Sequence, residues 1–335
     1  MTSLYIGVDI SKDTIDVAYW NGSAAKSIGT YANSETGFAE MVPHLTKLAG
    51  TQQICLVLEA TGSYHLSLSL FAFNQGWDVT LPNPKRVKDW AKGMGYRAKQ
   101  DKIDGRKLAH YGGLCQPPVQ PPLPPELDQL DNLLKRQQDL EHLLRQERNR
   151  LHALKVRPTV DPHVLASVER SIAFLSQELA LLNQAIDDFF DSHPEHNQAL
   201  HNLRLLPGVG PKNSPHLFLL LARWDNLTAG QGSAKQLTAF VGLDPQPFVS
   251  GTSVFKRPSI SKMGDSHLRS LLYMGALGGV RGHNPLRNFY QGLVNRGKAK
   301  KLALVASARK ILVWAWTCFS RNVPFDPKKV DPNFV

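Results

Sequence analysis

Two aspartates stand three residues apart in a strongly basic segment of this chain. Asp101 and Asp104 lie in "KQDKIDGRKLAHY", residues 99–111. If the segment is helical, this spacing places both carboxylates on one face of the helix. Two further acids occur in apolar runs typical of strands, Asp9 in "LYIGVDI" and Glu59 at the end of "ICLVLE". An acid in such a run is often only solvent-exposed, but a buried carboxylate needs a partner or a metal ion.

Four carboxylates gathered at one place repel one another unless divalent cations neutralise them. Oxygen ligands suit Mg²⁺ or Mn²⁺, and two such ions about 3.5–4 Å apart are the usual device for cutting a phosphodiester. We therefore predict that Asp9, Glu59, Asp101 and Asp104 form a catalytic metal site. The basic side chains around the Asp101–Asp104 pair are then expected to face phosphate.

The charge of the chain favours an anionic partner. Its 335 residues include 39 Lys and Arg against 28 Asp and Glu, a formal net charge of +11 at pH 7. Between Ser250 and Arg321 thirteen basic residues stand against the single acid Asp265. The positive field is therefore mainly C-terminal, and it would attract nucleic acid or an anionic membrane.

Other classes of protein lack support in the sequence. No uninterrupted apolar run reaches the roughly 20 residues that span a bilayer, and the first residues do not resemble a signal peptide. We therefore expect a cytoplasmic protein without a membrane partner. Cys55, Cys115 and Cys318 lie far apart without a CxxC pair, which argues against disulfides and structural zinc.

The elements that must position the acids follow from the hydrophobic pattern of the first hundred residues. Strands are expected at 4–10 and 14–20, in a short run ending at residue 31, and at 54–59 and 77–82; helices are expected at 35–48 and 64–76 and from residue 84. This order predicts a mixed sheet flanked by helices.

A proline-rich segment, "QPPVQPPLPPE" (residues 116–126), predicts a stiff linker and a domain boundary. Beyond it, apolar residues with helical 3,4 spacing run from 130 to 154 and from 165 to 189, with a proline-containing turn between them. These helices form either an antiparallel hairpin or part of an intermolecular bundle. The polar seam residues Gln137 and Glu147 would fix the register, although an ordinary helical spacer fits the pattern equally well.

A helical domain opens at about Leu203 with "LLPGVGPK" and runs to about Arg321. Its glycines resemble the turn of helix-hairpin-helix modules, in which backbone N–H groups and a nearby Lys, here Lys212, bind phosphate. A plain connection between two helices with a glycine cap explains the same residues about as well.

Other basic residues of this region are expected to contact nucleic acid, mainly through the backbone. Lys262 and Arg269 would position phosphate or lie on a helix surface, and the run at 298–301 would line the backbone or be a solvated helix start. The full set predicted to bind nucleic acid is Lys212, Lys256, Arg257, Lys262, Arg269, Lys298, Lys300 and Lys301.

Several motifs together resemble a known family. "GVDISKDTIDVAYW", "LEATGSYH" and "KQDKIDGRKLA" resemble the Asp, Glu, Asp, Asp signature of the RuvC-like nuclease domain in bridge-RNA-guided recombinases of bacterial insertion sequences, relatives of the Piv-type DNA invertases. "LPGVGP", "FVGLDPQPFVSGTS", "ISKMGDSHLRSLLYMGAL" and "AKKLALVASARKILVWAW" are similar to that family's transposase domain. The resemblance covers nearly the whole chain and departs from the family at "GPKNSPHLFLLL", which is unusually polar.

The resemblance implies three parts of the chain and a nucleophile. These parts are an α/β RNase H-like (RuvC-like) domain at 1–115, a linker and helical coiled-coil hairpin at 116–200, and a mostly α-helical transposase domain at 201–335. It places a catalytic serine at Ser250, in "SG" after "GLDP". From the residues alone a turn serine is the stronger interpretation, and Ser253, Ser259 and Ser261 offer the same chemistry.

The function that the resemblance implies is RNA-guided DNA recombination. The protein would exchange strands of donor and target DNA through a covalent serine–DNA intermediate, with a guide (bridge) RNA and as a homo-oligomer (dimer or tetramer) at the bacterial nucleoid. Its active site would combine the domains of two subunits. The alternatives are a guide-free site-specific invertase, a metal-dependent junction endonuclease in which water attacks, and a non-enzymatic nucleic-acid-binding protein whose acids are structural.

Overall fold

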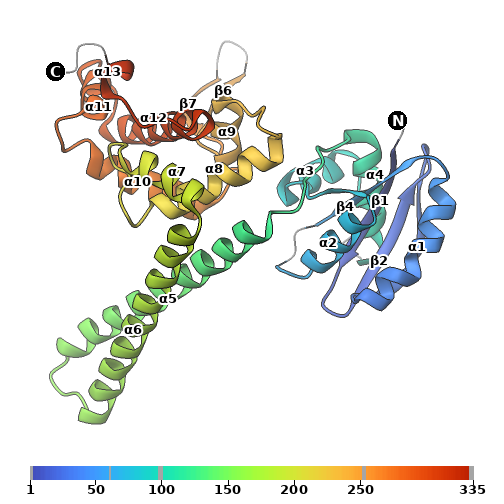
Figure 1. The fold of residues 1–335 in the computed structure, drawn as a ribbon, viewed down its shortest axis with the longest axis horizontal. Helices are drawn as coiled ribbons and strands as arrows, with labels where there is room; N and C mark the ends of the chain where they lie inside the picture. The colour runs from blue at the N-terminus through green and yellow to red at the C-terminus, as the bar shows by residue number, and fades with distance from the viewer. Residues whose placement is uncertain (1–2, 60–61, 97–100, 251–253, 332–335) are drawn as a thin grey trace. The chain divides into compact units, whose positions relative to one another are not determined.

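A computed structural model describes residues 3–59, 62–96, 101–250 and 254–331, without the side chains of residues 101–103 and 247–258. The chain divides into two compact units, Met1–Pro122 and Leu123–Val335. The first unit ends within the proline-rich segment, close to the expected boundary at residue 116. Each unit is described by itself below (Figure 1).

The N-terminal unit is built on a five-stranded mixed sheet with the order β3-β2-β1-β4-β5. Strands β1, β2 and β3 form an antiparallel meander, whereas β4 and β5 run parallel to β1. The strands are β1 (Ser3–Ile10), β2 (Thr14–Trp20), β3 (Ala25–Ala32), β4 (Gln53–Leu58) and β5 (Asp78–Thr80). The predicted mixed sheet flanked by helices is confirmed.

Alternation along the strands gives the sheet two different faces. Ile6, Val8 and Leu56 point into the larger core, which α1 (Glu35–Ala49) and α2 (Leu66–Asn74) cover with their buried side chains. Successive strand side chains point to opposite faces, so the residues between them face α3 (Pro84–Gly93) and α4 (Asp101–Cys115). A smaller core that includes Val57 lies on that second face.

Helix α4 lies directly on the strands because glycines face each other at the contact. A Cβ atom at Gly7 of β1 would lie 2.1 Å from the Gly105 carbonyl oxygen, and one at Gly112 would lie 2.9 Å from Cδ1 of Tyr5. Tyr5 thus lies by Gly112 and Gly7 by Gly105, so α4 runs antiparallel to β1. Its first turn lies at the end of the sheet where β1 and β4 end.

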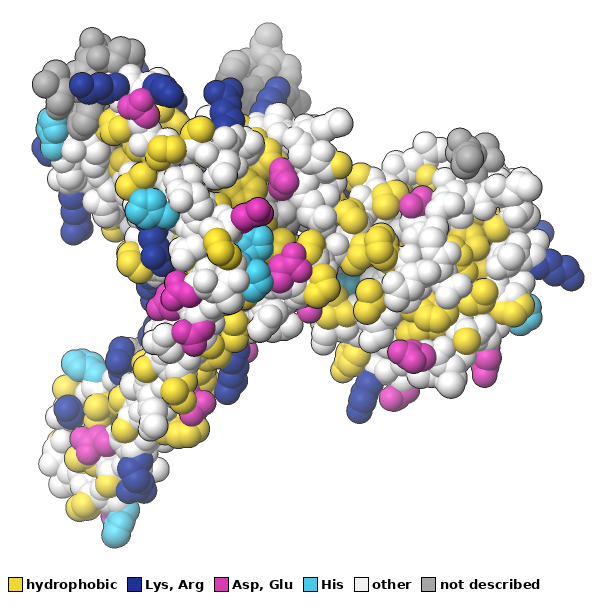
Figure 2. All heavy atoms as spheres, in the orientation of Figure 1, with side chains coloured by type: hydrophobic (Ala, Val, Ile, Leu, Met, Phe, Trp, Pro, Cys, Tyr) yellow, Lys and Arg dark blue, Asp and Glu magenta, His cyan; other side chains and the backbone are white. Residues whose placement is uncertain are grey.

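Two 31-residue helices, α5 (Pro125–Lys155) and α6 (Pro162–Ser192), pack side by side at the start of the second unit. The Gln137 side chain joins them, since its Nε2 donates to Asn183 Oδ1 at 2.7 Å. Its Oε1 lies 3.2 Å from His216 Nε2 of α8 (Ser214–Thr228). Apolar, acidic and basic side chains are mixed along the surface of this helix pair (Figure 2).

The base of the helix pair belongs to the core of the C-terminal unit. Leu130 and Leu134 of α5 and Phe189 of α6 are buried in the same cluster as Trp314 and Trp316. The expected separation of residues 116–200 from residues 201–335 is therefore not a packing boundary. Only the far part of the pair extends beyond this core, where Phe174 and Leu181 are each 60% exposed.

The rest of the second unit is mainly helical, as predicted. Its elements are α7 (Pro194–Arg204), α8 (Ser214–Thr228), α9 (Ala234–Val241), the antiparallel pair β6 (Pro245–Ser250) and β7 (Val254–Ile260), α10 (Ser266–Gly279), α11 (Pro285–Asn295), α12 (Lys300–Arg321) and α13 (Pro327–Val330). Helix α12 is long and apolar enough to cross a membrane by length and composition, but more than half of its apolar window is buried inside the protein. We therefore assign it to the protein core, which agrees with the contacts of Ile311 and Leu312 there.

Candidate active site

Asp9 and Glu59 come together through the parallel pairing of their strands. Val8 of β1 is in register with Leu58 of β4, so the next residues of the two chains, Asp9 and Glu59, are neighbours at the end of the sheet. Each acid also lies two residues beyond a position that contacts α4, Gly7 in one case and Val57 in the other. Both are partly exposed. Two of the four predicted acids thus lie at the same end of the sheet and on the same face of it.

The other two acids lie in the first turn of α4, which approaches the same edge. The Asp104 carboxylate is 25% exposed and forms an ion pair with the Lys107 ammonium, itself 19% exposed. The side chain of Asp101 lies outside the described residues, although its backbone begins α4. The fold therefore brings all four chain positions to one end of the sheet.

The donor set of this edge suits a hard divalent cation. Carboxylate oxygens are the ligands that Mg²⁺ and Mn²⁺ prefer. Among the described side chains, which exclude Asp101, no three acidic, His or Cys groups are close enough to hold a metal ion. The four residues fit such an ion because all are carboxylates and because their chain positions lie at one end of the sheet, on the face that α4 covers. The Lys107 ammonium adds one positive charge beside them. The metal ligation itself stays a prediction.

A fifth acid, Asp16, is not among the predicted site residues but lies beside them. It lies directly opposite Asp9 in the antiparallel β1–β2 pair, so both side chains point to the face that α4 covers. Its carboxylate accepts a hydrogen bond from the Thr30 hydroxyl. The signal was available in "TIDV", because Ile15 and Val17 are apolar and the acid between them must point to the opposite face.

Ser250 is the last residue of β6, and its backbone pairs with Val254 across the hairpin end. Its side chain and those of Lys256 and Arg257 lie outside the described residues, as does all of Ser253. The alternatives differ in their environment, since Ser259 is exposed whereas the Ser261 hydroxyl donates to the Asp244 carboxylate. The Ser261 hydroxyl is therefore already hydrogen-bonded within the protein. The role of Ser250 as the nucleophile stays a prediction.

The predicted nucleic-acid contacts fall into two groups. Lys298, Lys300 and Lys301 are exposed at the start of α12, and Lys262 is exposed after β7. By contrast, the Arg269 guanidinium donates to the backbone carbonyls of Val241 and Gly264 and braces a loop. The exposed lysines are available to a phosphate, whereas Arg269 is held by the protein.

The glycine turn that opens the C-terminal unit is used for packing. Gly208 has a φ of +84°, and a Cβ atom there would lie 2.2 Å from the Gly275 carbonyl oxygen of α10. The Gly210 N–H donates to Asn213 Oδ1 at 2.6 Å, and Lys212 forms a 2.7 Å ion pair with Glu141. These contacts favour a connection between helices over a phosphate-binding turn.

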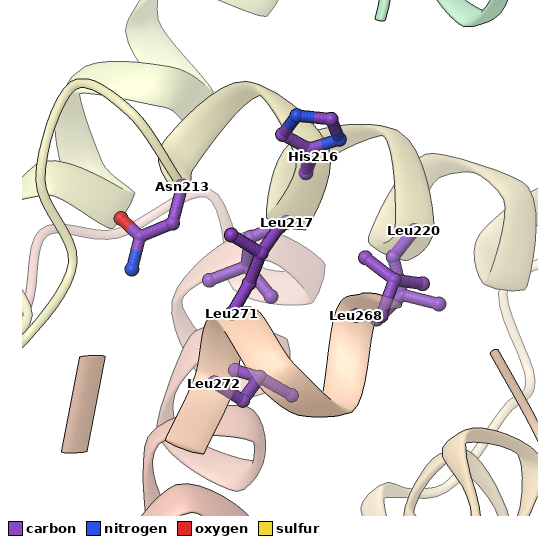
Figure 3. A pocket seen from close by; sticks show the side chains of 7 residues that line it. All are labelled: Asn213, His216, Leu217, Leu220, Leu268, Leu271 and Leu272. Carbon is purple, nitrogen blue, oxygen red and sulfur yellow. The ribbon is translucent and has the colours of Figure 1, made fainter. Parts of the chain in front are cut away.

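A small apolar cavity behind that turn holds the most perturbed histidine of the described residues. Figure 3 shows Leu217 and Leu220 of α8 facing Leu268 and Leu272 of α10, with His216 at the rim. Burial, with a smaller effect of His267, lowers the pKa of His216 to about 4. The side chain is therefore neutral at pH 7, and its Nε2 lies within hydrogen-bond distance of Gln137 Oε1.

An acid-bearing mixed sheet and a basic helical unit are features expected of an enzyme that acts on DNA, and comparison with known proteins establishes that class. Residues 6–155 match the DEDD family described as transposase, and residues 200–291 match the transposase IS116/IS110/IS902 family. The pilin gene-inverting proteins of Moraxella lacunata and Moraxella bovis are each 31% identical to this chain over 330 residues, which cover 98% of the chain and 99% of each relative. The chain belongs to the IS116/IS110/IS902 transposase family and is a DNA recombinase or transposase.

Proposed function

We propose that the protein is the transposase of a bacterial insertion sequence, which cuts and exchanges DNA strands under the guidance of an RNA from the element. The observation that carries this proposal is the convergence of Asp9, Glu59 and the first turn of α4 on one end of the sheet. Matches to transposase families along both units support it. Its place of action is the bacterial cytoplasm, at the nucleoid, as a homo-oligomer.

The acidic edge would hold Mg²⁺ or Mn²⁺ through Asp9, Glu59, Asp101 and Asp104. When bound, the metal would neutralise the charge that develops on the phosphate oxygens during cleavage. The close approach of Gly105 to Gly7 of β1 and to the Asp16 backbone of β2 lets α4 lie directly on both strands beside these acids. The Lys107 ammonium reduces the mutual repulsion of the carboxylates, because it pairs with Asp104.

Ser250 would supply the nucleophile. Its oxygen forms a bond to the scissile phosphorus, the bond from that phosphorus to a deoxyribose oxygen breaks, and the released oxygen takes a proton as a hydroxyl group. The serine proton passes to a base or to solvent. One phosphodiester is exchanged for another, so the strands can be rejoined without ATP.

The experiment that tests this function uses the full chain purified from cells carrying the complete element. With Mg²⁺, we expect strand exchange between plasmids bearing the element's ends and its target, and no exchange in EDTA. Sequencing of co-purifying RNA should recover a transcript of the element, and ribonuclease treatment should abolish exchange. Exchange that survives ribonuclease would contradict RNA guidance.

A second candidate is site-specific DNA inversion without a guide. It is favoured by one observation, the full-length similarity to two proteins named for inverting a pilin gene. A guide-free invertase would invert a segment between its own sites in the absence of RNA. The ribonuclease arm of the experiment therefore separates the two candidates.

A further inference from the structure

Most basic residues of the N-terminal unit fall in one short stretch of the sequence, which contains α3 and the start of α4. Of the twelve Lys and Arg residues between Met1 and Pro122, nine lie between residues 84 and 107, and the remaining three are Lys12, Lys26 and Lys47. The same short stretch contributes three acids, Asp89 and the pair in α4. The basic side chains around the Asp101–Asp104 pair are already expected to face phosphate, and the other predicted nucleic-acid contacts are in the C-terminal unit. The cations of α3 therefore have no assigned role.

Helix α3 presents its share of these cations to solvent. It buries Val87 and Ala91, which lie one helical turn apart, and exposes Lys85, Lys88 and Lys92 on another face. Arg86 is exposed as well. None of these four side chains forms an ion pair with a residue that the structure describes. They are therefore available to an external anion.

Chain connectivity places the start of α3 at the acidic edge. Strand β5 ends at Thr80, which is in register with Val57, two residues before Glu59. Helix α3 begins four residues later, and its N-cap Asn83 accepts a hydrogen bond from the backbone N–H of Lys85 at 2.9 Å. The positive end of the helix dipole thus lies at the end of the sheet that carries the acids.

A cleavage site made of carboxylates needs cations beside it, because the acids repel the phosphates that flank the scissile bond. Lysines on flexible stems bind the phosphate backbone and carry little base specificity. Trp90 packs on His110 and Tyr111 of α4, so α3 runs from the acidic edge toward the other end of the sheet. We infer that Lys85, Lys88 and Lys92, the α3 lysines, bind the phosphate backbone of the DNA along this helix, with Lys85 nearest the edge, and direct the strand to be cut toward Asp9 and Glu59. This inference rests on the proposed cleavage of DNA at that edge.

The test is a triple variant of the full chain, Lys85→Gln, Lys88→Gln and Lys92→Gln, in a DNA-binding titration at several salt concentrations. Each lost phosphate contact lowers the slope of log affinity against log salt by about 0.9, so we expect a slope smaller by about 2–3. At 0.1 M salt the Kd for duplex DNA should rise roughly 10²-fold. Cleavage should be restored when DNA is raised to saturation.

Two matched variants serve as controls. Lys26→Gln with Lys47→Gln removes two exposed lysines elsewhere on the same unit and should leave both Kd and slope unchanged. Lys85→Arg, Lys88→Arg and Lys92→Arg keeps the charge and should keep the affinity, which shows that the loss in the Gln variant is electrostatic. Equal melting temperatures of all three proteins exclude a folding defect.

An unchanged Kd and salt slope in the Gln variant would overturn the inference, as would a loss of affinity confined to RNA. Failure of the proposed function looks different. In that case the unmutated protein binds DNA through the α3 lysines but never cuts it, and Asp9→Asn changes nothing.

Discussion

Asp9 and Glu59 owe their common position to strand alternation, because each stands two residues past a position that contacts α4. We expect Asp9→Asn and Glu59→Gln each to lower DNA cleavage by about 10³-fold or more, since metal stabilisation of the transition state amounts to several kcal/mol. Binding and folding should persist, because the amides keep the size of the acids. Initial rates of plasmid cleavage in Mg²⁺ measure the effect. Full activity in both variants would remove the acidic site from the mechanism.

His216 gives a prediction about pH. Burial lowers its pKa in the folded protein to about 4, below the ordinary value of 6.5, so the unfolded chain binds more protons between these values. The free energy of unfolding therefore has its full contribution from His216 above pH 6.5. As the pH falls toward 4, about 2–3 kcal/mol of it is lost. His216→Gln should remove that part of the pH dependence. Urea unfolding at pH 7 and pH 4.5 tests it, and identical pH dependence of the two proteins would contradict the assignment.

At the level of elements, the glycine contact between α4 and β1 holds the acids together. Gly7→Ala would place a methyl group 2.1 Å from the Gly105 carbonyl oxygen, so α4 must move away from the sheet. We expect a loss of about 1–3 kcal/mol in unfolding free energy together with reduced cleavage. Gly93→Ala is the control, because nothing lies within 4 Å of its Cβ position. Equal stability of the two variants would show that the contact is not essential.

The long helix pair gives a second prediction at this level. Ile172 and Leu179 are partly buried on α6, whereas Phe174 and Leu181 are exposed. Ile172→Asp with Leu179→Asp should destabilise the protein by several kcal/mol, because charges would enter the seam with α5. Phe174→Asp with Leu181→Asp should leave stability unchanged. Urea unfolding and light scattering measure the stability and the oligomeric state of both variants. If Phe174→Asp with Leu181→Asp is the destabilised variant, α6 packs on α5 through the face that carries Phe174 and Leu181.

The sequence predicted the strands and their faces well because these depend on local patterns. The alternation of Ile6 and Val8 with Gly7 and Asp9 is visible within the seven residues of "LYIGVDI". The pairing of β1 with β4 joins segments about fifty residues apart, so local patterns do not specify it. The Lys107–Asp104 ion pair and the loop contacts of Arg269 depend on folded geometry in the same way.

At the scale of the whole molecule, the acids and Ser250 belong to different compact units of the chain. Transposase families match along both units, which supports a reaction that uses residues from each. If both parts take part in cleavage, loss of either part stops the same chemical step. An endonuclease that uses water needs the acids alone.

The most direct measurement is the formation of a covalent protein–DNA adduct on end-labelled donor DNA, resolved after denaturation and located by mass spectrometry. We expect an adduct on Ser250 in the unmutated protein, and none in Ser250→Ala or Asp9→Asn, while both variants still bind DNA. Ala changes at Ser253, Ser259 and Ser261 should leave the adduct in place. If Ser250→Ala cuts DNA at the normal rate and the unmutated protein never forms an adduct, water is the nucleophile and the serine mechanism is contradicted.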